Sequence, residues 1–326
     1  FRCACSMNSA FRASLCKGLV TSRTAATMLP DLPLFEQLSQ RVTTVLGCNP
    51  GPFTLQGTNT YLVGTGASRI LVDTGSAYSA QAYLENLERA MQATGCSQIE
   101  HIIITHNHED HTGGLEALKE RWPDARVAKY IPEKYQASFT DHSEGTVPLP
   151  SVEFSALESG QVLPVEGATL QVIATPGHTL DHISLYVKEE NTIIAGDCVL
   201  GSGTAVFSNL HLYLQSLRRL LKLNARSIYP GHGPFIEDAT SKINEYITHR
   251  ERRIAQVKAQ LLDGGLQTLS EITAAVYPPL SPSLVAAAQN NTRLVLEALE
   301  AQHIARREID APNSEAEKWR LVESAL

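Results

Sequence analysis

Residues 105–114 read THNHEDHTGG and follow the apolar run IEHIII at residues 99–104. A β-branched run of this kind is typical of a strand buried on both faces, so the polar stretch begins where a strand ends. Its ligand-type side chains are His106, His108, Asp110 and His111. On an extended backbone the first three point the same way and the fourth points elsewhere. Because imidazole and carboxylate groups suit zinc, we predict a metal-binding loop that turns through the glycine pair into a helix near Leu115.

Composition places the chain among ordinary globular proteins. Its 326 residues are 43% hydrophobic and 19% charged, enough for one large domain and a small one. No run of eighteen apolar residues occurs, so we expect no membrane span. The formal net charge of −7 becomes −11 without the four basic residues of the first thirty, and this balance gives no global attraction to nucleic acid.

Residues 1–30 have the composition of a mitochondrial transit peptide. They carry four basic residues, many Ser, Ala and Thr, and no acidic residue. We therefore expect a mitochondrial matrix location; the alternative is a disordered leader or an artefactual extension before Met28. The body contains only three scattered cysteines, Cys48, Cys96 and Cys198, which indicates a reducing compartment without a disulfide framework.

The first half of the body alternates apolar runs with turn residues. We expect helices at 34–46, 78–94 and 115–122, and strands at 59–63, 69–73, 99–104 and 126–130. The strands at 59–63 and 69–73 form a hairpin, and residues 131–163 read mostly as loop with one uncertain helix. Asp73 closes the second of these strands and either orients a metal ligand or forms a turn.

The second half repeats the pattern of apolar strands that end in polar residues. Strands are expected at 169–174, 183–187, 192–195 and 227–229, with a helix at 210–223. Three of the strand ends carry His178, Asp197 and His232. Each lies beside glycine, which permits close approach of the backbone to a compact site.

The ordered set His-x-His-x-Asp-His, Pro-Gly-His, Gly-Asp and Pro-Gly-His-Gly resembles the metallo-β-lactamase-fold hydrolases over residues 45–235. The resemblance implies an α/β fold, an αββα sandwich with its site at one edge of the paired sheets. It also implies two zinc ions, one held by His106, His108 and His178. The other would take Asp110, His111 and His232, with Asp197 bridging both ions.

Two adjacent ions have a clear chemical use. They hold a shared hydroxide whose pKa is pulled toward neutrality, and they stabilise negative charge on the attacked group. Asp110 can also take or relay the proton of that water, so we name Asp110 and Asp197 as catalytic. Carbonyl carbon and phosphorus are both attacked by this machinery, and the ligands therefore do not set the substrate.

Three further segments resemble an endoribonuclease branch of the same superfamily, from about residue 34 to the end of the chain. They read NPGP at 49–52, QGTNTYLVG at 56–64 and GHTLDH at 177–182. The resemblance implies hydrolysis of single-stranded RNA. It makes His182 a catalytic residue that supports the metal site or contacts phosphate; a hydrogen-bonded structural histidine is the alternative.

The chain after His232 changes to helices, expected at 239–262, 269–276 and 283–301, with a terminal ribbon at 302–309 and 318–322. We divide the chain into a leader (1–30), a catalytic domain (31–238) and a winged-helix-like unit (239–326). The basic residues of the ribbon are Arg306, Arg307, Lys318 and Arg320. They are candidates for RNA phosphate contacts, and a solvated helical cap is the alternative.

The rival function is thioester hydrolysis of the glyoxalase or acyl-carrier type. Such thioesterases carry similar metal loops, and an acidic protein suits a small substrate. β-Lactam cleavage is disfavoured because nothing indicates a secreted protein. The sequence does not indicate whether the chain has a protein partner. A basic groove leading from the metals would favour RNA, whereas a narrow apolar pocket would favour the thioester.

Overall fold

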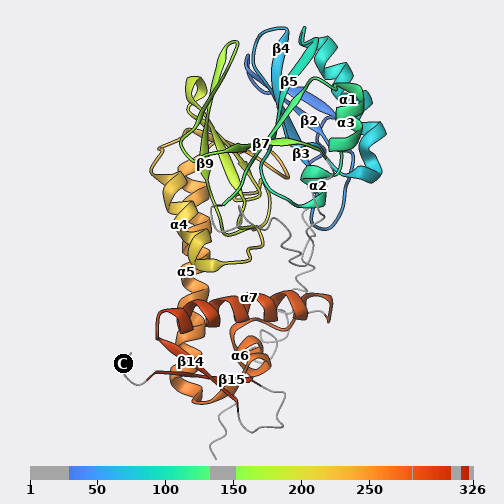
Figure 1. The fold of residues 1–326 in the computed structure, drawn as a ribbon. Helices are drawn as coiled ribbons and strands as arrows, with labels where there is room; N and C mark the ends of the chain where they lie inside the picture. The colour runs from blue at the N-terminus through green and yellow to red at the C-terminus, as the bar shows by residue number, and fades with distance from the viewer. Residues whose placement is uncertain (1–28, 133–151, 281, 310–316, 323–326) are drawn as a thin grey trace, which may run out of the picture. The chain divides into compact units, whose positions relative to one another are not determined.

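Two β-sheets packed face to face organise the protein (Figure 1). This computed structural model describes residues 29–132, 152–280, 282–309 and 317–322. The first sheet has the strand order β1-β2-β3-β4-β5-β6-β7. Its strands are β1 (Phe35–Gln37), β2 (Val42–Leu46), β3 (Asn59–Val63), β4 (Ser68–Val72), β5 (Gln98–Ile104), β6 (Arg126–Tyr130) and β7 (Phe154–Leu157). The second sheet has the order β12-β11-β10-β9-β8. Its strands are β8 (Val162–Val165), β9 (Ala168–Ala174), β10 (Ile183–Val187), β11 (Thr192–Gly196) and β12 (Ser227–Pro230).

Parallel pairing inside each sheet positions the polar strand ends. Strands β4 and β5 run parallel, with Val72 opposite Ile103, and β11 and β12 run parallel, with Ile194 opposite Tyr229. The carboxyl ends of parallel neighbours meet at one edge of a sheet. The segments that follow β4, β5, β11 and β12 therefore leave their sheets side by side.

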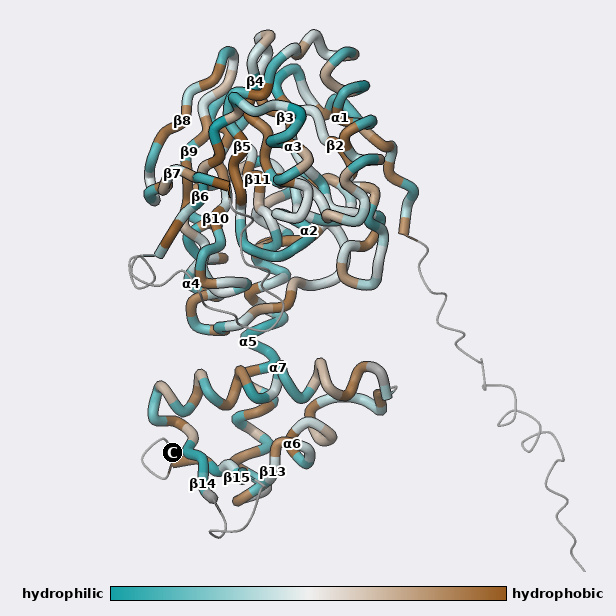
Figure 2. The backbone as a smooth tube through the Cα atoms, turned by 45° about the vertical axis from the view of Figure 1, so that its right-hand side comes forward, coloured by the Kyte–Doolittle hydropathy of each residue, from teal (hydrophilic) through white to brown (hydrophobic). Residues whose placement is uncertain are grey.

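Helices cover both outer faces, which confirms the predicted αββα sandwich. The first sheet is covered by α1 (Ala80–Ala93) and α3 (Leu115–Arg121), with η1 (Ala77–Ser79) and α2 (Glu109–Thr112) beside them. The second is covered by α4 (Leu210–Leu221) and α5 (Ala239–Gly264), and η3 (Lys188–Glu190) joins β10 to β11. Apolar side chains such as Val72 and Leu185 fill the space between the sheets. Strand β5, which is largely brown in Figure 2, is buried on both faces: Ile103 lies between the sheets, and Ile102 and Ile104 lie under the helices.

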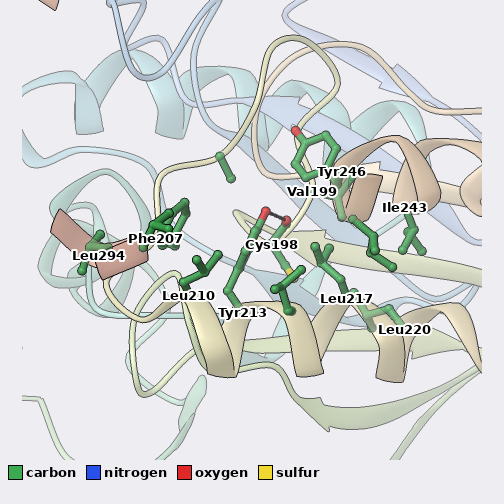
Figure 3. Close-up of a cluster of buried hydrophobic side chains, with 14 of the residues drawn as sticks. Cys198, Val199, Phe207, Leu210, Tyr213, Leu217, Leu220, Ile243, Tyr246 and Leu294 are labelled. Carbon is green, nitrogen blue, oxygen red and sulfur yellow. Dashed lines mark hydrogen bonds between the residues drawn. The ribbon is translucent and has the colours of Figure 1, made fainter. Parts of the chain in front are cut away.

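Helix α4 shows how the outer layer is held. The side chain of Asn209 caps its first turn by accepting a hydrogen bond from the Leu212 amide. Its inner face buries Leu210, Tyr213, Leu217 and Leu220 against Ile243 and Tyr246 of α5 (Figure 3). Each such side chain contributes about 1.5–3 kcal/mol on burial, so this face stabilises the outer layer.

The C-terminal part is a winged-helix unit. It contains β13 (Gln267–Thr268), α6 (Leu269–Val276), α7 (Pro282–Ala301), β14 (Ala305–Ile309) and β15 (Glu317–Leu321), with strand order β13-β15-β14. Thr268 and Glu271 form a capping box at the start of α6. Trp319 of β15 is buried, and Leu294 of α7 joins the same apolar cluster as Leu210 of α4. The core of the second sheet therefore continues into this unit.

Two predictions about secondary structure are wrong. Residues 34–46 form strands β1 and β2 instead of a helix, because the β-branched run at 42–46 pairs along its whole length with β3. Residues 131–163 contain β7 and the start of β8, which are edge strands of the first and second sheet. The part of this segment at 133–151 lies outside the described residues. None of the helices in the described part of the chain has the length and apolar character needed to span a membrane.

Candidate metal centre

All seven predicted metal ligands meet at the edge where β4, β5, β11 and β12 end. They form two groups, and within each group the ligand-type atoms lie within 4.8 Å of one another. The first group is His106, His108, His178 and Asp197, and the second is Asp110, His111 and His232. The grouping matches the one implied by the family resemblance.

The first group presents three ring nitrogens to one point. His106 Nε2 lies 3.0 Å from His108 Nδ1 and 3.2 Å from His178 Nε2, and the remaining pair is 3.0 Å apart. Ligand atoms of a tetrahedral zinc ion are about 3.3 Å apart when each is about 2.0–2.1 Å from the ion. The three nitrogens therefore have nearly the spacing of three corners of such a site.

The second group is built around a carboxylate. Asp110 Oδ2 lies 3.2 Å from His111 Nε2 and 3.2 Å from His232 Nε2. Asp197 reaches both groups, because its Oδ2 is 3.6 Å from His178 Nε2 and 3.3 Å from His232 Nε2. Asp197 would therefore be within reach of an ion held by either group.

The atoms of these imidazoles that face away from the centre are held by hydrogen bonds. His111 Nδ1 donates to Asp73 Oδ2 at 2.8 Å, and His178 Nδ1 donates to the Val206 carbonyl at 2.8 Å. Thr105 Oγ1 donates to Asp73 and accepts from His106 Nδ1 at 3.0 Å. Each of the three rings is thereby left with its Nε2 lone pair toward the centre. Two roles are predicted for Asp73, formation of a turn and orientation of a metal ligand. Its contacts with Thr105 and His111 support the second.

Two buried atoms at the centre lack any hydrogen-bond partner. They are His111 Nε2 and Asp197 Oδ1, which lie 3.4 Å apart. Leaving such groups unsatisfied costs about 1–3 kcal/mol each, and more for a charged group. A cation between them satisfies both, so the residues present fit the metal ions that the superfamily implies.

Burial and charge shift the pKa values of these groups in opposite directions. Burial lowers the pKa of His108 to about 4, with the neighbouring His178 acting in the same sense. Burial also disfavours the charged form of His232, but Asp197 and Asp110 together outweigh it and raise the pKa of His232 to about 9. The first group is therefore a set of neutral nitrogen donors, and the carboxylates of Asp110 and Asp197 create a negative potential at the second group that favours a cation.

The prediction that Asp110 shares an extended backbone with His106 and His108 is wrong. Helix α2 begins at Glu109, so Asp110 turns away and joins His111 and His232. Burial raises the pKa of Asp110, but the charge of the adjacent His111 outweighs it and, with a hydrogen bond from His232, holds it well below its usual range. Its carboxylate thus lies among the ligand-type atoms of the second group.

His182 lies behind Asp197 and does not reach the surface. Its Nε2 accepts from the Asp197 amide at 3.0 Å, so its Nδ1 carries the proton that is donated to Thr175 Oγ1 at 2.8 Å. Thr175 in turn bonds Ser184 Oγ, which donates to the Ala195 carbonyl. Both ring nitrogens are occupied, so His182 positions Asp197 and has no free atom for a phosphate.

Sequence reasoning missed three polar supports, Thr58, Asn49 and Thr175. Thr58 Oγ1 donates to Asp110 Oδ2 at 2.9 Å, and the Asn49 amide group donates to Thr58 Oγ1 at 3.0 Å. Asn49 and Thr58 lie in the quoted NPGP and QGTNTYLVG segments, and Thr175 precedes Pro-Gly-His. Their position inside these motifs was the available signal.

The predicted RNA-contacting residues lie on the β14–β15 ribbon, away from the seven ligand-type residues. Glu308 pairs with Arg306 at 2.6 Å and with Arg320 at 2.8 Å. Arg307 lies between Glu300 at 3.2 Å and Glu317 at 3.1 Å. Most of the positive charge on this ribbon is therefore balanced locally, and its contact with RNA stays a prediction.

Comparisons with known proteins agree with this geometry. The sequence model described as the Metallo-beta-lactamase superfamily matches residues 53–232, and the Beta-lactamase associated winged helix domain matches residues 268–319. A Caenorhabditis elegans protein named Beta-lactamase-like protein 2 homolog is 42% identical over 284 residues, 87% of this chain and 91% of that protein. An Aspergillus fumigatus protein named Atrochrysone carboxyl ACP thioesterase is 43% identical over 236 residues, 71% of this chain and 68% of that protein.

Solved structures share the fold. A Beta-lactamase domain protein from Burkholderia ambifaria has a TM-score of 0.75 at 19% identity, covering 90% of this chain and 95% of that one. A metallo-beta-lactamase family protein from Thermus thermophilus has a TM-score of 0.67 at 25% identity, covering 88% of this chain and 100% of that one. With its paired sheets, its His/Asp cluster and these matches, the chain belongs to the metallo-β-lactamase superfamily of hydrolases.

Proposed function

We propose that the chain is an endoribonuclease that hydrolyses single-stranded RNA with two zinc ions bound at the His/Asp cluster. Bound ions supply Lewis acidity that activates water near neutral pH and stabilises developing negative charge. Asp197 spans the two ligand groups, and Asp73, Thr105 and the Val206 carbonyl hold the imidazoles in the required tautomers. These contacts support the hydrolytic half of the proposal.

The observation that carries the RNA half is a pair of exposed aromatic side chains on the loops that support the metal ligands. Phe53 is 80% exposed and Tyr78 is 74% exposed. Aromatic faces stack on unpaired bases without regard to sequence, at about 1–3 kcal/mol per base.

Residues next to both aromatic side chains form hydrogen bonds that lead to the second ligand group. Phe53 lies in the turn where Thr54 Oγ1 donates to the Asn49 carbonyl, and Asn49 holds Thr58, the partner of Asp110. Tyr78 follows Ala77, whose amide donates to the Glu109 carboxylate at 2.8 Å, next to Asp110. The segments that carry both rings are therefore held by the same hydrogen bonds that support the second ligand group.

The second candidate function is thioester hydrolysis, which the identity with the Aspergillus thioesterase favours. One experiment separates the two. Zinc-loaded protein is given a labelled single-stranded RNA and, separately, a glutathione thioester, with His178→Ala as the metal-site control. The proposal expects RNA to be cut by the wild type and spared by the control. Thioester turnover with intact RNA would overturn it.

A matched substitution sharpens the substrate assignment. Phe53→Leu keeps an apolar side chain but loses the stacking face, so we expect RNA cleavage to fall by about tenfold, or about 1.4 kcal/mol, through KM. Thioester hydrolysis needs only apolar contact there and should be unchanged. Location in the mitochondrial matrix belongs to the same proposal and rests on the composition of residues 1–30.

A further inference from the structure

A pocket of about 230 Å³ lies beside the metal edge, between the loop before α4 and helices α5 and α7. Its polar lining is provided by His249, Arg250, Arg253, Thr204, Tyr277 and Asn291. Three of these are basic residues of one helix, and no carboxylate is found among its described lining residues. The pocket is therefore electropositive although the whole chain is acidic.

Arg250 is the most unusual member of this lining. Only 6% of it is exposed, and its Nη2 donates to the Ala205 carbonyl at 2.6 Å. The guanidinium lies over the rings of Phe207, at 4.8 Å, and Tyr213, at 5.7 Å, which Figure 3 shows stacked beside α4. Its Nε is buried and has no hydrogen-bond partner. In the part of the chain that the structure describes, no carboxylate oxygen comes within 4.0 Å of it. A buried, unpaired cation is costly unless an anion completes it.

Arg253 lies about one helical turn after Arg250, and His249 directly precedes Arg250 in α5. Arg253 Nη1 donates to the Val276 carbonyl at 2.8 Å, and its guanidinium stacks 3.7 Å over the ring of Tyr277. Burial and the charges of Arg250, Arg253 and Arg252 lower the pKa of His249, while Glu245 opposes them. Glu245 is itself engaged by Lys242 at 3.0 Å. Burial and the neighbouring guanidinium charges therefore both disfavour protonation of His249.

One loop joins this pocket to the metal centre. The Ala205 carbonyl accepts from Arg250, and the next carbonyl, that of Val206, accepts from the metal-centre residue His178. The Ser208 amide then donates to the Gly177 carbonyl at 2.7 Å, which fixes the loop to the Pro-Gly-His turn. Arg250 therefore holds the carbonyl that directly precedes the one supporting His178.

We propose that this pocket binds a phosphate of the RNA strand next to the cleaved link, and this assignment rests on the proposed function for its ligand. Guanidinium forks match phosphate oxygens in geometry and charge, and the Thr204 and Asn291 side chains offer further donors. The pocket supplies the electropositive contact that the locally balanced β14–β15 ribbon lacks.

The helix offers a matched control for the test. Arg252 lies between the two pocket residues in sequence, is exposed, and does not line the pocket. Zinc-loaded wild type, Arg253→Gln and Arg252→Gln are compared for kcat and KM on a labelled single-stranded RNA at several salt concentrations. Turnover of a small chromogenic phosphodiester, which needs only the metal centre, is measured beside them.

We expect Arg253→Gln to raise KM for RNA about tenfold with kcat little changed, because a charge-assisted phosphate contact is lost. The slope of log KM against log salt should fall by about 0.7, the value for one phosphate contact on a single strand. Arg252→Gln and the small substrate should show neither change. Arg250→Lys, which keeps the charge but not the fork, tests the buried position and should also raise KM for RNA.

Equal effects of Arg252→Gln and Arg253→Gln would refute phosphate binding in this pocket, since the attraction would then be nonspecific. An unchanged KM in both Arg253→Gln and Arg250→Lys would refute it as well. If the wild type leaves RNA uncut, the proposed function fails separately. The same proteins are then compared for equilibrium binding of the intact strand, where tighter binding by wild type and Arg252→Gln than by Arg253→Gln supports the pocket and equal binding rejects it.

Discussion

The polar side chains at the metal edge are buried and committed to one another, whereas those of the β14–β15 ribbon lie at the surface in ion pairs. At the edge, His111 and His106 are fully buried, and each gives one nitrogen to a support and keeps the other for the centre. On the ribbon, Arg306 and Arg307 keep about half of their side-chain surface exposed and face glutamates. Buried polar atoms must be satisfied, whereas exposed ion pairs contribute about 0–1 kcal/mol.

The difference shows that unsatisfied buried polar atoms indicate a ligand site better than exposed charged residues do. At the edge, the atoms left over after all internal hydrogen bonds are counted converge on two points, which indicates a ligand that completes them. On the ribbon, internal pairing accounts for the three arginines, so no ligand is required there. The four predictions that follow test this contrast.

The largest effect is expected from Asp197→Ala. Asp197 reaches both ligand groups, so its loss should remove the bridge and lower kcat by more than about a hundredfold, since transition-state stabilisation by metal is worth several kcal/mol. Metal analysis should find fewer than two ions per chain. Asp124→Ala, at an exposed position, is the control. Full activity with two ions still bound would refute the bridging role.

A smaller effect is expected from Asp73→Asn. The residue has a φ of +63°, a conformation that Asn tolerates, so the substitution removes charge without adding strain. Loss of the carboxylate that accepts from His111 should weaken zinc binding by about 10–100-fold, measured by competition with a chelator. Asp263→Asn on the surface serves for comparison. Wild-type zinc affinity would remove Asp73 from the support of the site.

Thr175→Val tests the buried chain behind Asp197. It leaves the Nδ1–H of His182 without an acceptor, so the free energy of unfolding should fall by about 1–3 kcal/mol in urea denaturation. Thr43→Val is the matched control, because the Thr43 hydroxyl is buried without a partner and its removal should cost little. Equal losses in the two variants would mean that the hydroxyl of Thr175 does not stabilise His182.

The smallest effect is expected from neutralising the ribbon. Replacing Arg306, Arg307, Lys318 and Arg320 by Gln together should change RNA binding by less than about threefold, since the arginines already face glutamates. Binding measured at several salt concentrations should keep its slope. A loss of tenfold or more with a flatter slope would show that the ribbon contacts RNA, and would reverse the contrast with the metal edge.

The amino-acid sequence by itself identified the chemistry of the site and much of the fold. The spacing of polar residues after apolar runs located seven ligand-type side chains that meet within two groups. Strands β3, β6 and β10 and helix α6 occur at the predicted residues, because their signals are local: β-branched runs, a capping box and turn residues. Signals of this kind depend on neighbouring residues in the chain, so they can be read without the tertiary structure.

Only the tertiary structure determined which of these residues contact one another. The run at 42–46 became strand β2 because β3 was available to pair with it, and Asp110 joined His111 because α2 begins one residue earlier. Asp73, Thr58 and Thr175 gained their roles from partners 38, 52 and 7 residues away. Pairing of this kind depends on sheet order and burial, which periodicity does not encode. For the same reason the sequence did not indicate that Arg250 is buried.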